Sequence, residues 1–327
     1  MEYPISDLKT LIFKALSHAG IPSEQATIIM EHAVEAQLSG KPTHGIKMII
    51  GIVEKYKKSN PSNITVIKDT PISSLLDGGD LPGVYVATKA MDRAIEKAKT
   101  IGIGIVGGYN TGGIGILALY MKQATRRDLI GLSTCSSTGS VVPYGSASSI
   151  LGTNPIAVGI PSEPLPIILD MATSSITFSE VKDAIDKGIP VKPNCVVDEN
   201  GRTTTDPKMV FKGGILPFDR SYKGYGLGLI AEVLGGPLVN AKAGWNAVKG
   251  TWGFIMIAMN PEVLVSLEKF KADVKSLIDE IKNSKLADGF EEVLIPGERS
   301  LRNMKQCLEH GNVSVDEQII NTIKTLT

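Results

Sequence analysis

Apolar side chains recur every three to four positions along the first 60 residues, which is the spacing of amphipathic helices. The same spacing returns near the C-terminus, so both ends of the chain are predicted to be mainly helical. The predicted helices cover residues 6–20, 23–40, 45–58, 262–281 and 315–326, and one strand is expected at 292–295.

Between these ends, short apolar runs alternate with helical segments, which is typical of an α/β fold. The predicted strands are 64–67, 72–76, 101–106, 129–134, 156–160, 167–169, 195–197 and 253–259, and the predicted helices are 82–99, 116–127, 179–187 and 224–234. We therefore predict two domains. A helical domain combines residues 1–70 with 262–327, and an α/β domain covers 71–261.

The composition narrows the class of protein. The 327 residues carry 34 basic and 34 acidic side chains, so the formal net charge is zero at pH 7. A neutral chain argues against broad nucleic-acid binding, and no apolar stretch is long enough to span a membrane. The start, MEYPISDLKT, lacks the apolar core of a signal peptide, and the three cysteines are too widely spaced for a zinc site or a disulfide framework. We expect a cytoplasmic protein with no metal, nucleic-acid or membrane partner.

Glycine is abundant, and Gly102, Gly104 and Gly107 match the GxGxxG pattern of dinucleotide-binding folds. That pattern requires glycines between a strand and a helix, whereas these lie within a predicted strand. Glycines inside a strand usually mark close packing or a bulge, so we reject the Rossmann interpretation. The next cluster, 107–115, does lie between a strand and a helix. It is either an anion-binding loop or a flexible loop.

Only one of the four histidines is placed for chemistry. His18 and His32 fall within predicted helices and His310 in a polar C-terminal stretch, whereas His44 occupies a turn beside Pro and Gly. Functional residues gather in such turns, and imidazole is the commonest acid/base group. The dipole of the helix that follows favours the neutral imidazole. A capping or packing role is the alternative.

Three further segments carry polar residues at the ends of predicted elements. Thr153 and Asn154 precede a strand, Asp170 ends one, and Lys223 opens a helix. These positions suit contacts with polar ligand groups, the orientation of an imidazole, and a phosphate or carboxylate contact, respectively. An ordinary turn, a solvated or capping Asp and a solvated Lys are the alternatives. Spacing alone supports a two-domain α/β enzyme that binds a small anionic molecule.

Taken in order, these segments resemble the type 2 malate/L-lactate dehydrogenase family. The matching motifs are THG (43–45), VVPYG (141–145), GTNPIA (152–157), DMATS (170–174), GRTTTDP (201–207), KGYGL (223–227), NPE (260–262) and PGE (296–298). The resemblance implies NAD(P)-linked interconversion of a small 2-hydroxy acid and a 2-oxo acid, or reduction of a cyclic imine carboxylate. It also implies a non-Rossmann fold with a mixed sheet, and a homodimer.

The resemblance also implies roles for individual residues. His44 is expected where the nicotinamide meets the substrate, with Asp170 as its orienting partner. Thr43 and Lys47 are expected to contact the carboxylate substrate beside His44. The residues expected near the dinucleotide, NAD or NADP, are Ser137, Thr153, Asn154, Asp170, Met171, Ala172 and Lys223.

Three positions depart from the family pattern. Gly113 stands where many members carry the acid/base histidine, and Met48 stands where they carry a carboxylate-binding arginine. Ser179-Glu180 replaces a frequent Gly-Lys. Hydride transfer to a carbonyl needs a proton donor, which contributes about 10²–10⁴-fold. Either His44 supplies the proton while Lys47 or Lys223 binds the carboxylate, or the chain is a catalytically impaired member that keeps the dimer, with or without dinucleotide binding.

Overall fold

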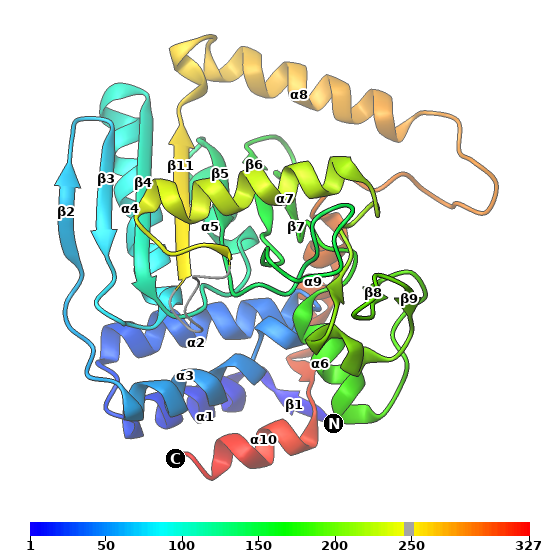
Figure 1. Cartoon of the computed structure of the whole chain (residues 1–327). Helices are drawn as coiled ribbons and strands as arrows, with labels where there is room; N and C mark the ends of the chain where they lie inside the picture. Colours follow the sequence, from blue (N-terminus) through cyan, green and yellow to red (C-terminus); the bar gives the residue numbers. More distant parts are fainter. Residues whose placement is uncertain (245–251) are drawn as a thin grey trace.

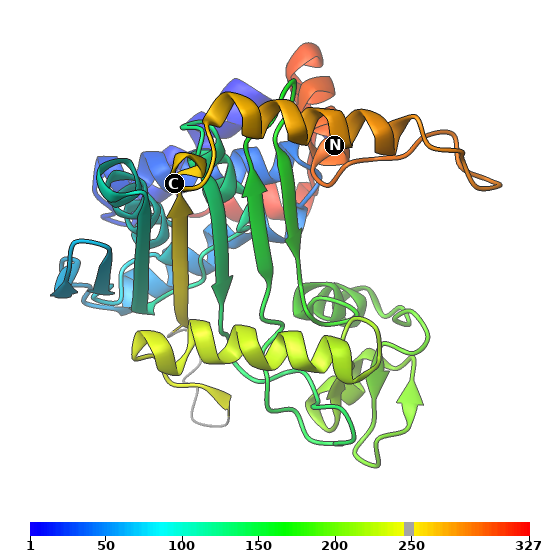
Figure 2. The ribbon, with the colours of Figure 1, turned by 90° about the horizontal axis from the view of Figure 1, so that it is seen from above.

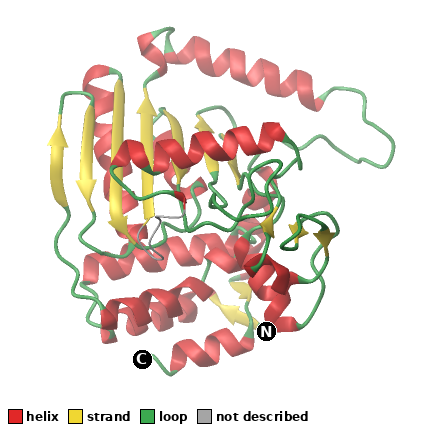
Figure 3. Cartoon of the chain, viewed as in Figure 1, coloured by secondary structure: helices red, strands yellow, loops and turns green. Residues whose placement is uncertain are grey.

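A seven-stranded mixed sheet forms the centre of the protein (Figures 1 and 3). This is seen in a computed structural model that describes residues 1–244 and 252–327. Only the β3–β4 pair is parallel among the described strands of this sheet; the other neighbours are antiparallel. The mixed α/β fold is therefore confirmed. In spatial order the strands are β2 (Thr65–Asp69), β3 (Ser73–Asp77), β4 (Ile103–Thr111), β11 (Trp252–Met259), β5 (Ile130–Cys135), β6 (Ile156–Ile160) and β7 (Ile167–Met171).

Helices α4 (Gly83–Ile101) and α5 (Ala118–Thr125) pack against this sheet, and the GxGxxG glycines serve that packing. Gly102 ends α4 with a φ of 93°, which favours glycine. A Cβ at Gly104 would lie 2.0 Å from the carbonyl oxygen of Ala94, so only glycine allows α4 to approach β4 this closely. The rejection of a Rossmann fingerprint is confirmed.

Helix α7 (Tyr222–Gly235) crosses the sheet where β5 ends and β11 begins (Figure 2). The approach is close, because a Cβ at Gly235 would lie 2.5 Å from the backbone nitrogen of Ser136. The Ser136 hydroxyl also donates a 2.9 Å hydrogen bond to the Gly235 carbonyl. Helix α7 is thereby held at one edge of the sheet.

The two ends of the chain share one hydrophobic core. It includes Leu8, Ile12, Ile29, Ile49 and Ile320, which are fully buried. Both termini lie at this end of the molecule (Figure 1). The helices are α1 (Ile5–His18), α2 (Ser23–Leu38), α3 (Lys47–Lys58) and α10 (Glu317–Lys324), and a two-stranded sheet pairs β1 (Glu2–Pro4) with β12 (Asn312–Ser314). Residue 70, the predicted limit of the helical domain, follows β2, and β2 pairs with β3 in the large sheet.

The C-terminal region differs most from the sequence-based expectation. The prediction of a strand at 292–295 is wrong, and α9 (Glu298–His310) was not predicted. Helix α9 carries a narrow apolar stripe that includes Met304 and Cys307, but no residue of it is fully buried and most of the segment is polar or charged. Helix α8 (Leu267–Lys282) starts later than predicted, after a 3₁₀ turn at Pro261–Val263, with Ser266 as its cap.

A small subdomain lies beside the α7 edge of the sheet (Figure 2). Its elements are α6 (Phe178–Lys187), β8 (Val196–Val197), β9 (Thr203–Thr204), the 3₁₀ turn Pro207–Phe211 and β10 (Gly214–Ile215). Helix α6 begins with a capping box, in which the Glu180 carboxylate accepts hydrogen bonds from the Thr177 nitrogen at 2.9 Å and from its hydroxyl at 2.7 Å.

Across the described residues, no helix combines the length and apolar character needed to cross a membrane.

Candidate active site

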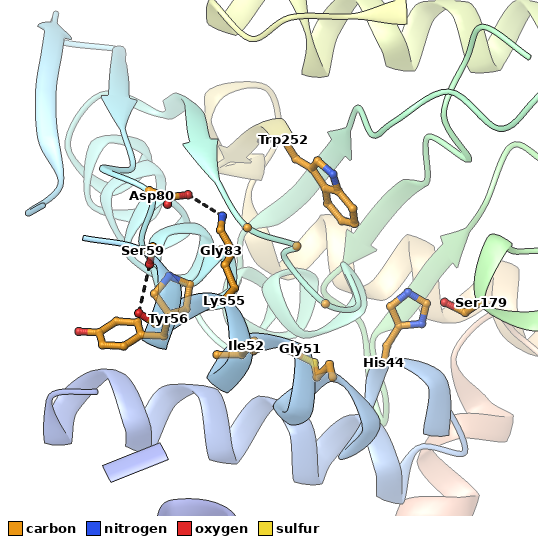
Figure 4. A pocket seen from close by; sticks show the side chains of 15 residues that line it. His44, Gly51, Ile52, Lys55, Tyr56, Ser59, Asp80, Gly83, Ser179 and Trp252 are labelled. Atoms are coloured by element: carbon orange, nitrogen blue, oxygen red, sulfur yellow. Dashed lines mark hydrogen bonds and ion pairs between the residues drawn. The ribbon is translucent and has the colours of Figure 1, made fainter. Parts of the chain in front are cut away.

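A cavity of about 260 Å³ opens where α3 faces the glycine-rich end of β4 and the start of β11. Figure 4 shows His44 and Ser179 at one end of this cavity and Lys55, Asp80 and Ser59 at the other. Its lining residues are His44, Met48, Gly51, Ile52, Lys55, Tyr56, Ser59, Asp80, Pro82, Gly83, Gly112, Gly113, Gly115, Ser179 and Trp252. We call it the His44 cavity.

His44 ends a 3₁₀ turn, Pro42–His44, that precedes α3. Its Nδ1 lies 3.1 Å from the Thr43 hydroxyl, so Thr43 orients the ring. Burial lowers the pKa of His44, the charge of Lys41 lowers it further, and the charge of Glu180 opposes both. The direction agrees with the expected neutral imidazole, but burial is the main cause.

The three departures from the family pattern gather around His44. Met48, Gly113 and Ser179 all line the His44 cavity, although they come from α3, the loop after β4 and the start of α6. A Cβ at Gly113 would lie 3.1 Å from the Trp252 ring, so the indole occupies the space beside this glycine. Trp252 is a cavity residue that was not predicted, because a tryptophan directly before a predicted strand resembles a core residue.

Lys47 is engaged elsewhere. Its ammonium forms an ion pair with Asp183 and lies 3.9 Å from Asp186, both on α6, and Lys47 does not line the His44 cavity. Glu180, which replaces a base in the family pattern, caps α6. Lys47 therefore joins α3 to α6, and Glu180 stabilises the start of α6. As a result, Lys47 does not supply a cation to the cavity wall near Met48.

Asp170 lies in a different cavity from His44. This second cavity, of about 190 Å³, also contains Lys41, Lys122 and Arg299. The Asp170 carboxylate accepts a 2.8 Å hydrogen bond from the Ala118 nitrogen, and no hydrogen bond joins it to His44 within the described part of the chain. Burial raises the pKa of Asp170, while that hydrogen bond and the charge of Lys41 oppose the rise. The structure therefore does not place Asp170 as the orienting partner of His44; Thr43 has that position.

His32 is closer to the site than its position in a predicted helix indicated. It is buried, and its Nε2 accepts a 3.1 Å hydrogen bond from the Ile116 nitrogen. Burial and the nearby His44 lower the pKa of His32 to about 3, so it is neutral at physiological pH. A Cβ at Gly115 would lie 2.0 Å from this Nε2, so the glycine-rich segment closes directly over the ring. His32 thus fixes one wall of the His44 cavity.

The residues expected near the dinucleotide gather along one sheet edge. Thr134, Ile156 and Met171 are successive register partners, so β5 ends, β6 begins and β7 ends at the same edge. Ser137 and Ala172 follow two of these strands, and Thr153 precedes the third. Helix α7 runs past this edge, and Lys223 is exposed in its first turn. The hydroxyls of Ser137 and Thr153 and the ammonium of Lys223 are groups suited to contact the phosphates and ribose hydroxyls of a dinucleotide.

Asn154 has a different role from its neighbours on that edge. It is fully buried, and its amide donates hydrogen bonds to Glu232 at 2.6 Å and to the Gly228 carbonyl at 3.0 Å. The Glu232 carboxylate also accepts from the nitrogens of Gly152 at 3.1 Å and Gly244 at 3.0 Å. Asn154 therefore acts through α7 and the loop geometry, because it is enclosed by protein. We call these contacts the Asn154–Glu232 network.

Comparison with known proteins decides the family. The profile described as malate/L-lactate dehydrogenase matches residues 3–324. The chain belongs to the malate/L-lactate dehydrogenase family. It is therefore an NAD(P)-dependent dehydrogenase, as the sequence motifs implied.

Members of this family resemble the chain over almost its whole length. It is 37% identical to the L-sulfolactate dehydrogenase of Methanocaldococcus jannaschii, with 97% of this chain and 94% of that protein covered. It is 36% identical to the malate/(S)-sulfolactate dehydrogenase of Methanothermus fervidus, with 97% and 95% covered. The crystal structure of malate dehydrogenase from Entamoeba histolytica superposes with a TM-score of 0.93 at 27% identity, over 100% of this chain and 97% of that one.

Proposed function

We propose that this dehydrogenase interconverts a 2-hydroxy acid and a 2-oxo acid with NAD or NADP, and that His44 transfers the proton. The observation that carries the proposal is the position of His44, a partly buried imidazole with a lowered pKa in a cavity beside the family motifs. Relatives named for malate and sulfolactate, both 2-hydroxy acids, support the substrate class.

The neutral form of His44 is suited to oxidation of a hydroxy acid. When Nδ1 donates its proton to the Thr43 hydroxyl, Nε2 carries a free lone pair that accepts the proton of the substrate hydroxyl. The bound nicotinamide supplies the hydride acceptor for oxidation or the hydride donor for reduction. Reduction requires the protonated ring, so we expect it to be favoured at lower pH. Ser137, Thr153, Met171, Ala172 and Lys223 would hold the dinucleotide at the sheet edge, and Asp170 would close its inner side.

The substrate carboxylate needs donors other than an arginine at position 48. Thr43 adjoins His44, and Lys47 lies one residue from Met48 but is paired with Asp183. We propose that Thr43 contacts the substrate carboxylate directly. Lys47 can contribute only if its ion pair with Asp183 of α6 breaks. A cyclic imine carboxylate is a second substrate class, since a protonated imine needs less electrophilic assistance than a ketone.

Turnover assays test this proposal. The purified protein is assayed with NADH and NADPH on pyruvate, oxaloacetate, sulfopyruvate and piperideine-2-carboxylate. We expect turnover of at least one acid, and we expect His44→Ala to lower kcat/KM by about 10²–10⁴-fold. His18→Ala, at an exposed histidine of α1, is the matched control. Tight NAD(P)H binding without turnover would instead identify a catalytically impaired member.

We also propose that the protein is a cytoplasmic homodimer, with the helical region from both chain ends (residues 1–70 and 262–327) contributing to the interface. Helix α8 lies along the outside of the molecule (Figure 1), and only Ile278 among its residues is buried. A single helix of this length is marginal in water without packing. Leu277, which is 54% exposed, and Ile230 of α7, which is 55% exposed, are available to a second copy. Sedimentation at several concentrations tests the dimer, and a monomer throughout would contradict it.

A further inference from the structure

The His44 cavity continues well beyond the position of the imidazole. Its lining residues on α3 are Met48, Gly51, Ile52, Lys55 and Tyr56, which recur every three or four positions and so form one face of the helix, and Ser59 caps the end of that helix. From Met48 to Tyr56, a rise of 1.5 Å per residue gives a length of about 12 Å, and the lining continues to Ser59. An acid as small as lactate or malate would occupy only the end beside His44.

The chemistry of the wall changes along this length. Met48, Ile52 and Trp252 present apolar side chains in the section next to His44. The far section contains the ion pair between Lys55 and Asp80, at 2.5 Å. Figure 4 shows this pair and Ser59 at the end of the cavity opposite His44 and Ser179. The cavity is thus an apolar passage that ends at a charged pair.

Glycines keep the passage open. Gly51 lies in the middle of the α3 face, and a Cβ there would meet no atom within 4 Å. Inside a helix, glycine is less stabilising than alanine by about 1 kcal/mol. Helix stability therefore does not explain Gly51, and close packing does not explain it either, because no neighbouring atom excludes a Cβ there. On the opposite wall, a Cβ at Gly83 would lie 2.1 Å from the Gly112 carbonyl oxygen, so that wall is made of backbone in close contact.

We propose that the substrate is a 2-hydroxy or 2-oxo acid with an extended apolar substituent, which lies along α3 between Met48 and the Lys55–Asp80 pair. The inference rests on the proposed function, because the reacting carbon is placed at His44. Met48 provides an apolar contact for the first carbons of the substrate's substituent. The Lys55–Asp80 pair sets the length limit, because an apolar chain reaching further would desolvate these charges.

A chain-length series tests the inference. The 2-oxo acids pyruvate, 2-oxobutyrate, 2-oxopentanoate and 2-oxohexanoate are compared with NADH and NADPH. Each methylene that enters the apolar passage is expected to raise kcat/KM about fourfold. A kcat/KM that is flat or falls with chain length, in an enzyme that turns over pyruvate, would overturn the inference and leave the proposed function intact.

Variants of α3 locate the effect. Gly51→Leu fills the passage from a position with open space, so the ratio of kcat/KM for 2-oxohexanoate to that for pyruvate should fall at least about fivefold. Gly51→Ala should give a smaller fall in the same direction. Glu54→Leu places the same side chain on the exposed face of α3, outside the cavity, and should leave the ratio unchanged. An equal fall in Glu54→Leu would contradict a role for the passage.

A binding measurement keeps the inference testable even without turnover. Thermal shifts are recorded with lactate and with 2-hydroxyhexanoate, in wild type and in Gly51→Leu. We expect the longer acid to raise Tm more than lactate does, and we expect Gly51→Leu to abolish that difference. If the two acids give equal shifts in wild type, the passage does not bind the substituent. If no acid is turned over but the difference is present, the proposed function fails and the passage is still a binding site.

Discussion

The His44 cavity and the Asn154–Glu232 network are built in opposite ways. The cavity is lined by five glycines, and its imidazole faces open space with one neighbouring hydroxyl as hydrogen-bond partner. In the network, the Glu232 carboxylate is 4% exposed and accepts three hydrogen bonds from protein groups. Both regions contain family motifs. The difference shows that the THG motif provides a side chain exposed to the cavity, whereas the GTNP motif, through Asn154, holds its own loop against α7.

The largest expected effect within this comparison is on stability at the network. Glu232→Ala leaves the donors of Gly152, Asn154 and Gly244 without their acceptor in a buried site, so the free energy of unfolding should fall by about 3 kcal/mol or more. Urea denaturation measures it. Glu280→Ala, at an exposed glutamate of α8, is the control and should change little. A loss below about 1 kcal/mol would show that water replaces the carboxylate.

The next effect concerns the buried imidazole beneath the cavity. The pKa of His32 is about 3 in the folded protein and near 6.5 when unfolded, so the unfolded state binds one more proton between these values. Stability should therefore fall as pH drops below 6.5, by up to about 1.4 kcal/mol per pH unit from this residue. His32→Gln should reduce the slope, whereas His18→Gln, on the surface, should not. Equal slopes in wild type and His32→Gln would contradict a neutral buried His32.

The smallest effect tests how the cavity orients its imidazole. Thr43→Val removes the hydroxyl 3.1 Å from Nδ1, so kcat/KM should fall by up to about tenfold with little change in Tm. An acceptor at Nδ1 stabilises the protonated ring, so its loss should lower the pKa of His44 further. The acid limb of the pH profile for hydroxy-acid oxidation, already below pH 6.5, should then move to lower pH. Thr43→Ser should restore both values. An unchanged pH profile in Thr43→Val would show that contacts other than the Thr43 hydroxyl orient the His44 ring.

Much of the fold was predictable because it is encoded by local periodicity. All seven strands of the large sheet and seven of the eight longest described helices were expected within a few residues of their observed bounds. Helix α9 was not predicted because its segment is mostly polar, and its apolar residues Met304 and Cys307 are only partly buried against the core. The strands β1 and β12 are three residues long and exist only because the two chain ends pair with each other. No local pattern carries that information.

The sequence alone determined that His44 is the candidate acid/base, that Gly102–Gly107 is not a Rossmann fingerprint, and that the family is that of malate/L-lactate dehydrogenase. These conclusions depend on residue type and spacing along the chain. The tertiary structure decided that Asp170 and His44 lie in different cavities, that Lys47 is paired with α6, and that Met48 and Gly113 border one long passage. Each of these relations joins residues far apart in the chain, and side-chain contacts of that kind are set by packing.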